Sequence, residues 1–314
     1  MKYVVAGNAV ADCINYADGT SAGFRPGGAT LFALTGIQLW TDDVLMCGGF
    51  GEDYMQQLGD YLERNRIDRR GFHVRDPHHP INYMYYRDEG GWDTKTVHGF
   101  AHYDNLCCNP EEDGLRRFLT DARAVCTFRG EDPEFFREMF ALQEEFGFRF
   151  GWEIRGSMCV PEKLPLIRRL LERVDAFSLN GPEACALFGV DGDEAAVDAL
   201  LALRVPLVIF RVGKRGLYVL KDGEVLFAPS FEKYPVVDVT GCGNTSTASG
   251  FYAFWEGKDI YDIAAYANVA SAHNLRVYGA MDLGPAQRAE ALSDEAAFSR
   301  ELRMTQTVQR RVRR

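Results

Sequence analysis

The 314-residue sequence lacks the features that mark membrane, secreted and metal-binding proteins. No apolar run approaches the ~20 residues that a helix needs to cross a bilayer, and the N-terminal apolar stretch is too short for a signal peptide. The eight cysteines form no CxxC pair, which predicts reduced, mostly buried thiols and a cytoplasmic protein. The six histidines form no His/Cys cluster with zinc spacing. We therefore expect neither a membrane partner nor a structural metal.

Positive charge is also scarce, except near residue 314. The chain has 45 acidic and 35 basic residues and a formal net charge of −10, and an acidic body disfavours a nucleic-acid surface. Residues 300–314 reverse this balance with six arginines and one glutamate. Such a segment is able to touch RNA or an acidic partner, but a charge run of this kind is more often a solvated, frayed end. We expect no nucleic-acid partner.

Short apolar strands alternate with amphipathic helices along most of the chain. The composition, 46% apolar and 25% charged, is that of an ordinary globular protein. Continuous apolar strands that are each followed by an amphipathic helix predict a parallel sheet covered on both faces. The predicted strands are Lys2–Ala6, Val44–Gly48, Ala124–Phe128, Phe148–Trp152, Ala176–Leu179 and Leu207–Arg211. The predicted helices are Asp53–Asn65, Glu134–Glu145, Glu162–Val174, Pro182–Phe188 and Glu194–Leu203.

Two segments depart from this alternation and are predicted to be β-hairpins. Residues 82–87 and 94–98 flank the turn sequence DEGG, and residues 217–220 and 225–228 flank KDGE. The first hairpin suits a small β-lid, which we expect to come from residues of about 13–25 and 80–103. No repeat, low-complexity stretch or linker divides the chain. We therefore expect a single α/β domain over residues 1–314, with a small β-lid.

The sharpest motif lies within Val236–Trp255. A strand is predicted to end at Asp238, and Gly241-Cys242-Gly243 then leads into a helix of small residues from about Asn244. Glycines permit a tight turn and a close backbone approach to a ligand, and the N-terminus of a helix favours an anion. Taken alone, such a segment is more often a plain glycine turn before a packed helix.

In its context, this segment resembles the second signature of the ribokinase-like (PfkB) carbohydrate kinases, D-T-x-G-A-G-D followed by small residues. Here it reads Asp238-Val239-Thr240-Gly241-Cys242-Gly243-Asn244. Taken alone, Asn180 and Glu183 would be interpreted as a helix capping box, and Asp12 as a turn residue. The resemblance is supported because these residues and the other matching segments occur along the chain in the order that the family has. Those matches are Asp12 after the first strand, Pro26-Gly27-Gly28-Ala29-Thr30, Gly49-Phe50-Gly51-Glu52-Asp53, Asn180-Gly181-Pro182-Glu183, Arg211-Val212-Gly213-Lys214-Arg215-Gly216, and Ala267-Asn268-Val269-Ala270 with Gly279.

The resemblance implies a Rossmann-like, doubly wound sandwich and a kinase that uses ATP and Mg²⁺ to phosphorylate a hydroxyl of a sugar or sugar-like molecule. Gly241, Cys242 and Gly243 would form the anion hole, and Asn244 occupies the position of the catalytic base. The implied substrate residues are Asp12, Gly27, Gly28 and Glu153. The implied nucleotide residues are Asn180, Glu183, Arg211, Gly213, Gly216 and Asn268. In this scheme Glu183 holds Mg²⁺ through water, and Asp238 supports a monovalent cation such as K⁺.

Asn244 departs from the family pattern, because an amide has no pKa near 7 and cannot act as a general base. Arg211 also replaces a threonine, and Glu153 stands where many members have asparagine. Three hypotheses follow: a kinase that is slower or takes Asp12 or Glu153 as base, a pseudokinase that binds nucleotide or sugar in a regulatory role, and a different reaction on the same scaffold. A dehydrogenase is a more distant alternative, since the segment GNAVAD after the first strand lacks GxGxxG.

The expected lid is rich in aromatic side chains, namely Tyr83, Tyr85, Tyr86 and Trp92. Many relatives dimerise by pairing their lids, so the resemblance implies a homodimer in which these side chains face a second subunit. The alternative is that they form one covered face of the hairpin.

Overall fold

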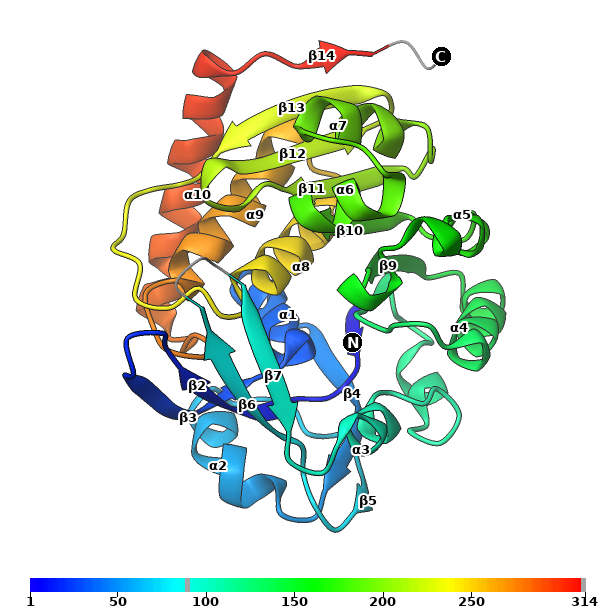
Figure 1. Cartoon of the computed structure of the whole chain (residues 1–314), viewed down its shortest axis with the longest axis vertical. Helices are drawn as coiled ribbons and strands as arrows, with labels where there is room; N and C mark the ends of the chain where they lie inside the picture. The colour runs from blue at the N-terminus through cyan, green and yellow to red at the C-terminus, as the bar shows by residue number, and fades with distance from the viewer. Residues whose placement is uncertain (88–90, 312–314) are drawn as a thin grey trace.

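A mixed ten-stranded sheet forms the centre of the molecule (Figure 1). The structure is a computed structural model that describes residues 1–87 and 91–311. Neighbouring strands are parallel from β5 to β11, and they are antiparallel from β11 to β14. The order across the sheet is β14 (Gln309–Arg310), β13 (Glu224–Pro229), β12 (Gly216–Lys221), β11 (Leu207–Arg211), β10 (Ala176–Asn180), β9 (Arg149–Glu153), β8 (Ala124–Thr127), β1 (Tyr3–Ala6), β4 (Val44–Gly51) and β5 (Phe72–Asp76). The predicted apolar strands and the second predicted hairpin are thus confirmed.

Helices cover both faces of this sheet, and each face has its own apolar core. Parallel strands are joined by crossover helices, which is why both faces become buried. One face carries α1 (Ala29–Gln38), α2 (Tyr54–Arg64), α8 (Cys242–Trp255), α9 (Ile260–Asn274) and α10 (Pro285–Thr305). The other face carries α4 (Pro133–Phe146), α5 (Leu164–Leu171), α6 (Gly181–Phe188) and α7 (Asp193–Leu201). Among the described residues, no helix is long and apolar enough to cross a membrane.

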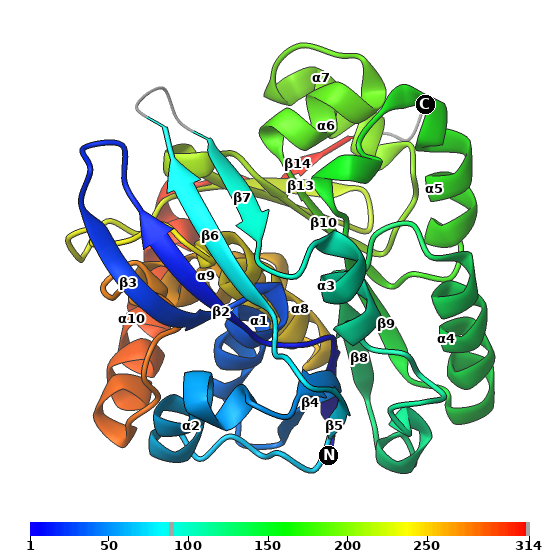
Figure 2. The same ribbon diagram turned by 60° about the horizontal axis from the view of Figure 1, so that its bottom comes forward.

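A separate four-stranded sheet forms the lid (Figure 2). Its order is β3 (Ser21–Gly27), β2 (Val10–Asn15), β6 (Ile81–Tyr86) and β7 (Trp92–Thr96), with β2 and β6 parallel in the middle. Strands β2 and β3 span residues 10–27 and so extend beyond the predicted segment 13–25 at both ends, whereas β6 and β7 span residues 81–96 and lie within the predicted segment 80–103. The chain leaves β7 at residue 96 and forms helix α3 (Phe100–Leu106) rather than a further part of the lid.

The predicted strand that ends at Asp238 is wrong. Residues 230–240 form no strand, although Val236, Val237 and Val239 are apolar and β-branched. These valines are 62%, 40% and 49% exposed, and their segment belongs to neither sheet. The segment is held instead by a hydrogen bond from Val237 N–H to the Leu275 carbonyl (2.7 Å). Helix α8 follows and begins at Cys242, two residues before the predicted start.

Candidate active site

A cavity of about 730 Å³ lies where the carboxyl ends of the parallel strands meet the lid. Ligands of open α/β sheets bind at this edge, outside the carboxyl ends of the strands. Gly27 and Asp238 do not line the cavity, but their neighbours Gly28 and Val239 do. The structure brings together the other predicted site residues in its wall: Asp12, Gly28, Glu153, Asn180, Glu183, Arg211, Gly213, Gly216, Gly241, Cys242, Gly243, Asn244 and Asn268.

The N-terminus of helix α8 opens into the cavity without a side-chain cap. Its N-cap residue is Gly241, whose φ of 73° is in the left-handed region, and a Cβ there would lie 2.2 Å from the ring of Phe32. A Cβ on Gly243 would lie 1.9 Å from Nη1 of Arg211. Burial raises the pKa of the Cys242 thiol, so this side chain stays neutral. The turn therefore presents backbone N–H groups and a guanidinium group, which together favour a bound anion.

Glu153, Arg211 and Asn244 meet at the mouth of this turn. Oε1 of Glu153 accepts hydrogen bonds from Nη2 of Arg211 and from Nδ2 of Asn244, both at 2.9 Å. Oε2 of Glu153 is buried and has no hydrogen-bond partner within the described residues. Burial raises the pKa of Glu153, and the neighbouring Arg211 opposes that shift. The carboxylate is thus held through Oε1 by two hydrogen bonds and lies in the cavity wall, as a positioned base requires.

Asn180 and Glu183 form a complete capping box at the N-terminus of helix α6. Oδ1 of Asn180 accepts from Glu183 N–H (3.0 Å), and Oε2 of Glu183 accepts from Asn180 N–H (2.8 Å). The capping interpretation is therefore confirmed. Both residues also line the cavity, and Oε1 of Glu183 is left for a further contact.

Three more predicted nucleotide residues lie around the same part of the cavity. Gly213 has a φ of 65° and Gly216 a φ of 122°, and a Cβ on Gly216 would lie 2.1 Å from the Ala228 carbonyl oxygen. These glycines are therefore required by the backbone of the turn between β11 and β12. Asn268 is buried in α9 and donates through Nδ2 to the Ala264 carbonyl at 3.2 Å.

Asp12 lies at the base of the lid and is almost fully buried. Its Oδ2 accepts from Gly28 N–H and its Oδ1 from Nδ2 of Asn82, both at 3.1 Å. A Cβ on Gly27 would lie 2.0 Å from Oδ2 of Asp12, so this glycine allows the carboxylate to approach the backbone. Burial raises the pKa of Asp12 to about 6, against the hydrogen bonds from Asn82 and Gly28.

Asp238 is buried in the loop before α8 and binds its own neighbours. Oδ1 accepts from the backbone N–H (3.1 Å) and the hydroxyl (2.8 Å) of Thr240, and Oδ2 accepts from Gly279 N–H (3.2 Å). These bonds join the loop to the segment after α9. The residues that the structure describes include no group of three or more His, Cys, Asp or Glu side chains placed to hold a metal ion.

Sequence reasoning missed several residues that line the cavity, among them Asn82, Tyr103, Arg129 and Arg155. They come from the lid, from α3 and from the loops after β8 and β9, and no local spacing relates them. Only the fold brings them to the same cavity, so no signal in the sequence could have found them.

The lid aromatics separate into different surroundings. Tyr86 lines the cavity, where its hydroxyl lies 2.8 Å from that of Thr240 and its ring stacks on Tyr16. The prediction that it faces a second subunit is therefore wrong for Tyr86. Tyr85 is 45% exposed, and Tyr83 meets the exposed Phe24 edge to face. The side chain of Trp92 lies outside the described part of the structure.

Comparisons with known proteins find similarity to carbohydrate kinases in part of the chain. Residues 155–287 match the pfkB family carbohydrate kinase model. A ribokinase from Bacillus subtilis is 31% identical over 116 residues, which are 37% of this chain and 38% of that protein. An uncharacterized protein from Schizosaccharomyces pombe is 23% identical over 325 residues, which cover 89% of this chain and 85% of the relative.

Solved structures extend the likeness to nearly the whole chain. The ribokinase of Arabidopsis thaliana, complexed with ribose and ATP, has a TM-score of 0.75 at 20% identity and covers 94% of this chain and 98% of its own. The adenosine kinase of Sinorhizobium meliloti has a TM-score of 0.74 at 17% identity, with 93% and 99% covered. The chain therefore has the ribokinase-like α/β fold, and its residues 155–287 are similar to the pfkB family of carbohydrate kinases.

Proposed function

We propose that this protein transfers the terminal phosphoryl group of ATP to a hydroxyl of a sugar or sugar-like small molecule, with Mg²⁺ bound. One observation carries the proposal: the uncapped N-terminus of α8 and the lid carboxylate of Asp12 border the same cavity. The first suits the transferring phosphoryl group and the second the hydroxyls of an acceptor. The relatives named as ribokinases and the ribokinase complexed with ribose and ATP support it.

The phosphate end of the cavity is formed by cationic and N–H donors. Gly241–Gly243 and Arg211 stabilise the charge of the transferring group, since phosphoryl transfer depends mainly on positioning and charge stabilisation. The remaining nucleotide contacts come from Asn180, Gly213, Gly216 and Asn268. The free Oε1 of Glu183 fits a Mg²⁺ ion held through water, because Mg²⁺ keeps several waters and uses few carboxylates. When bound, the ion neutralises phosphate charge.

Glu153 takes the proton from the acceptor hydroxyl in this proposal. The family pattern has an asparagine at this position and an aspartate at position 244, so amide and carboxylate have exchanged places across the 2.9 Å contact between Asn244 and Glu153. Asn244 then positions the carboxylate that receives the proton. Asp12 is less suited to act as the base, because both of its oxygens already accept hydrogen bonds. It binds the acceptor instead, together with Gly27 and Gly28.

A second candidate is a pseudokinase that binds nucleotide or sugar without turnover. The ion pair between Arg211 and Glu153 favours it, because the cation stabilises the ionised carboxylate and weakens it as a base.

The deciding experiment measures ADP release by the purified protein with ATP, Mg²⁺ and a panel of sugars, polyols, nucleosides and sugar acids. We expect turnover with at least one acceptor. ATP binding without turnover across the panel supports the pseudokinase, and no ATP binding contradicts both candidates. The same assay with K⁺ replaced by tetramethylammonium tests the proposal that the loop of Asp238 supports a monovalent cation.

Two further parts of the proposal concern the protein's surroundings. All eight cysteines are free thiols, as a reducing cytoplasm favours. We also propose a homodimer through the lid, where Phe24 and Tyr85 are 51% and 45% exposed. Sedimentation of the native protein and of Phe24→Asp tests this: a dimer that becomes a monomer supports it, and a native monomer contradicts it.

A further inference from the structure

Arg129 follows strand β8, and its side chain lines the cavity near α3. Its Nε donates to Oδ2 of Asp132 (3.0 Å), as does Nη2, and Nη1 donates to the Asp104 carbonyl (3.1 Å). Asp132 is also the N-cap of α4 and accepts from Phe135 N–H, so its charge is shared with that helix. Each Nη nitrogen carries two N–H bonds, and therefore each keeps one for a further acceptor.

Arg155 follows strand β9 and reaches the same place from the other side. Nε donates to the Phe128 carbonyl (3.2 Å), Nη1 to Oδ1 of Asp104 (2.8 Å) and Nη2 to Sγ of Cys107 (3.4 Å). The thiol is a weak acceptor, and the Asp104 side chain is 47% exposed, which screens its charge. Arg155 is thus only partly satisfied by its neighbours.

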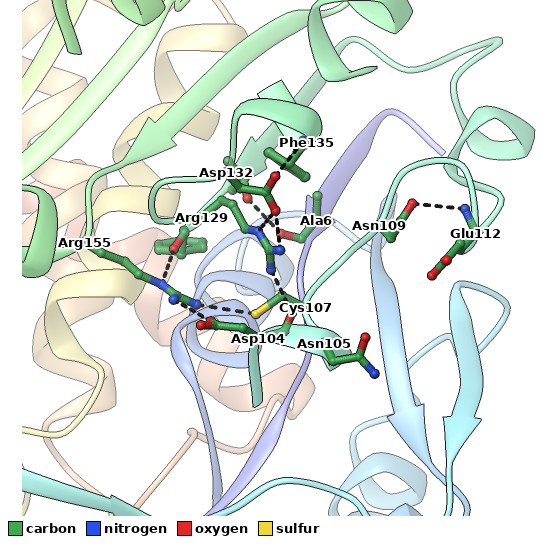
Figure 3. Close-up of polar contacts among 12 residues, drawn as sticks. Ala6, Asp104, Asn105, Cys107, Asn109, Glu112, Arg129, Asp132, Phe135 and Arg155 are labelled. Atoms are coloured by element: carbon green, nitrogen blue, oxygen red, sulfur yellow. Dashed lines mark hydrogen bonds and ion pairs between the residues drawn. The ribbon is translucent and has the colours of Figure 1, made fainter. Parts of the chain in front are cut away.

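The two guanidinium groups, here called the arginine pair, converge on Asp104 and Cys107 (Figure 3). Each is kept in orientation by an aromatic ring, Arg129 over Phe135 at 5.8 Å and Arg155 over Tyr103 at 5.4 Å. Fixed guanidinium groups lose little entropy on binding and match the planar geometry of a carboxylate or the oxygens of a phosphate.

The carboxylates that line the cavity are engaged elsewhere: Asp12 with the lid, Glu153 with Arg211, and Glu183 in its capping box. Each arginine has one carboxylate partner, but Asp132 also caps α4 and the Asp104 side chain is 47% exposed. A neutral acceptor would cover the remaining N–H groups of the arginine pair without supplying a charged hydrogen-bond acceptor, and burying such donors without one is costly. We infer that the acceptor of the proposed kinase carries an anionic group, a carboxylate or a phosphate, that the arginine pair binds. This inference rests on the proposed function and names the class of acceptor.

The arginine pair is separate from the cations at the phosphate end of the cavity, Arg211 and Lys214, which belong to β11 and the turn after it. The anionic group therefore fixes the end of the acceptor that does not react. A sugar acid or a sugar phosphate fulfils this requirement, and a simple sugar, polyol or nucleoside does not.

Calorimetry tests this with three ligands of the same carbon skeleton: a sugar alcohol, the corresponding aldonic acid and the corresponding sugar phosphate. We expect the acid or the phosphate to bind at least about tenfold more tightly than the alcohol, as one charge-assisted pair allows. Arg129→Gln should lower this affinity to that of the alcohol. Asp104→Asn should raise it, because Arg155 loses its competing carboxylate. Arg116→Gln, at an exposed arginine paired with Glu145, is the matched control and should change nothing.

The two anionic ligands show which anionic group the arginine pair binds. Tighter binding of the aldonic acid identifies a carboxylate, and tighter binding of the sugar phosphate identifies a phosphate. Equal affinity for all three ligands, no binding by any of them, or affinity unchanged by both Arg129→Gln and Asp104→Asn would overturn the inference. An increase with Asp104→Asn cannot come from general damage to the fold. If the protein released ADP with neutral sugars and Arg129→Gln did not change that rate, the inference would be overturned and the proposed function would stand. Binding of the acid, with no ADP release in the presence of any acceptor, would support the anion site at the arginine pair and contradict the proposed kinase activity.

Discussion

Helices α6 and α8 both point their N-termini at the cavity, but they end in opposite ways. Helix α6 is closed by its own side chains, since Asn180 and Glu183 satisfy backbone N–H groups of its first turn. Helix α8 begins at Gly241 with no side-chain cap. A helix leaves its first N–H groups without intrahelical partners, so a helix end that lacks a capping side chain beside a cavity is available to a ligand. In the proposed function, the first turn of α6 is stabilised by its own side chains, and the N-terminus of α8 binds the anion.

The largest expected effect is that of Gly243→Ala. The new Cβ would lie 1.9 Å from Nη1 of Arg211 and would displace the guanidinium group from the anion hole. We expect a loss of kcat of about 10²–10³-fold or more, as for removal of an oxyanion donor. The matched control is Gly181→Ala at the start of α6, where a Cβ meets only the Arg211 carbonyl at 3.9 Å. Comparable losses in both variants would break the distinction between the helices.

Arg211→Met should reduce kcat and also change its pH dependence. Arg211 holds the pKa of Glu153 below the value that burial alone would give. Without the cation, the pKa of Glu153 should rise, so that the carboxyl stays protonated up to a higher pH. The acid limb of the pH–rate profile should therefore move to higher pH. A pH–rate profile measures this. An acid limb that does not move would show that Glu153 is not the titrating base.

Asp12→Asn should stabilise the protein at pH 7 while weakening acceptor binding. Burial raises the pKa of Asp12 from 3.8 to about 6, so the folded state loses stability as the pH rises from about 4 through 6. The ionised carboxylate then costs at most about 3 kcal/mol, at 1.36 kcal/mol for each pKa unit. Thermal unfolding of both proteins at pH 4 and pH 7 should show a gain that is confined to pH 7. A gain of equal size at both pH values would contradict this assignment.

Asn180→Ala should have the smallest effect on catalysis and a clear effect on stability. Loss of the N-cap costs about 1 kcal/mol, which chemical denaturation can measure. We expect kcat at saturating ATP to change little, because the Asn180 side chain caps α6 and its proposed contact to the nucleotide affects the KM for ATP instead. A large fall in kcat with unchanged stability would show that α6 also contacts the phosphates directly.

Local patterns explain which parts of this molecule the sequence predicts well. The glycines at 241 and 243 and the Asn180–Glu183 capping box lie within single turns, so spacing alone identifies them. The strand before Asp238 was predicted wrongly because a run of valines says nothing about whether a sheet edge is free to pair with it. Glu153, Arg211 and Asn244 attract attention one by one, because each differs from the residue that the resemblance leads us to expect. Their shared hydrogen bonds depend on α8 packing across β9 and β11, which β10 separates in the sheet. The arginine pair depends likewise on loops and on α3.

The central claim is that amide and carboxylate have exchanged roles between positions 244 and 153. The measurement that tests it most directly is the turnover of the native protein beside Glu153→Gln and Asn244→Asp, with the best acceptor and saturating ATP and Mg²⁺. The account predicts an active native enzyme and a loss of about 10²–10⁴-fold in Glu153→Gln, the usual contribution of a general base. An inactive native protein that gains activity only in Asn244→Asp would contradict it.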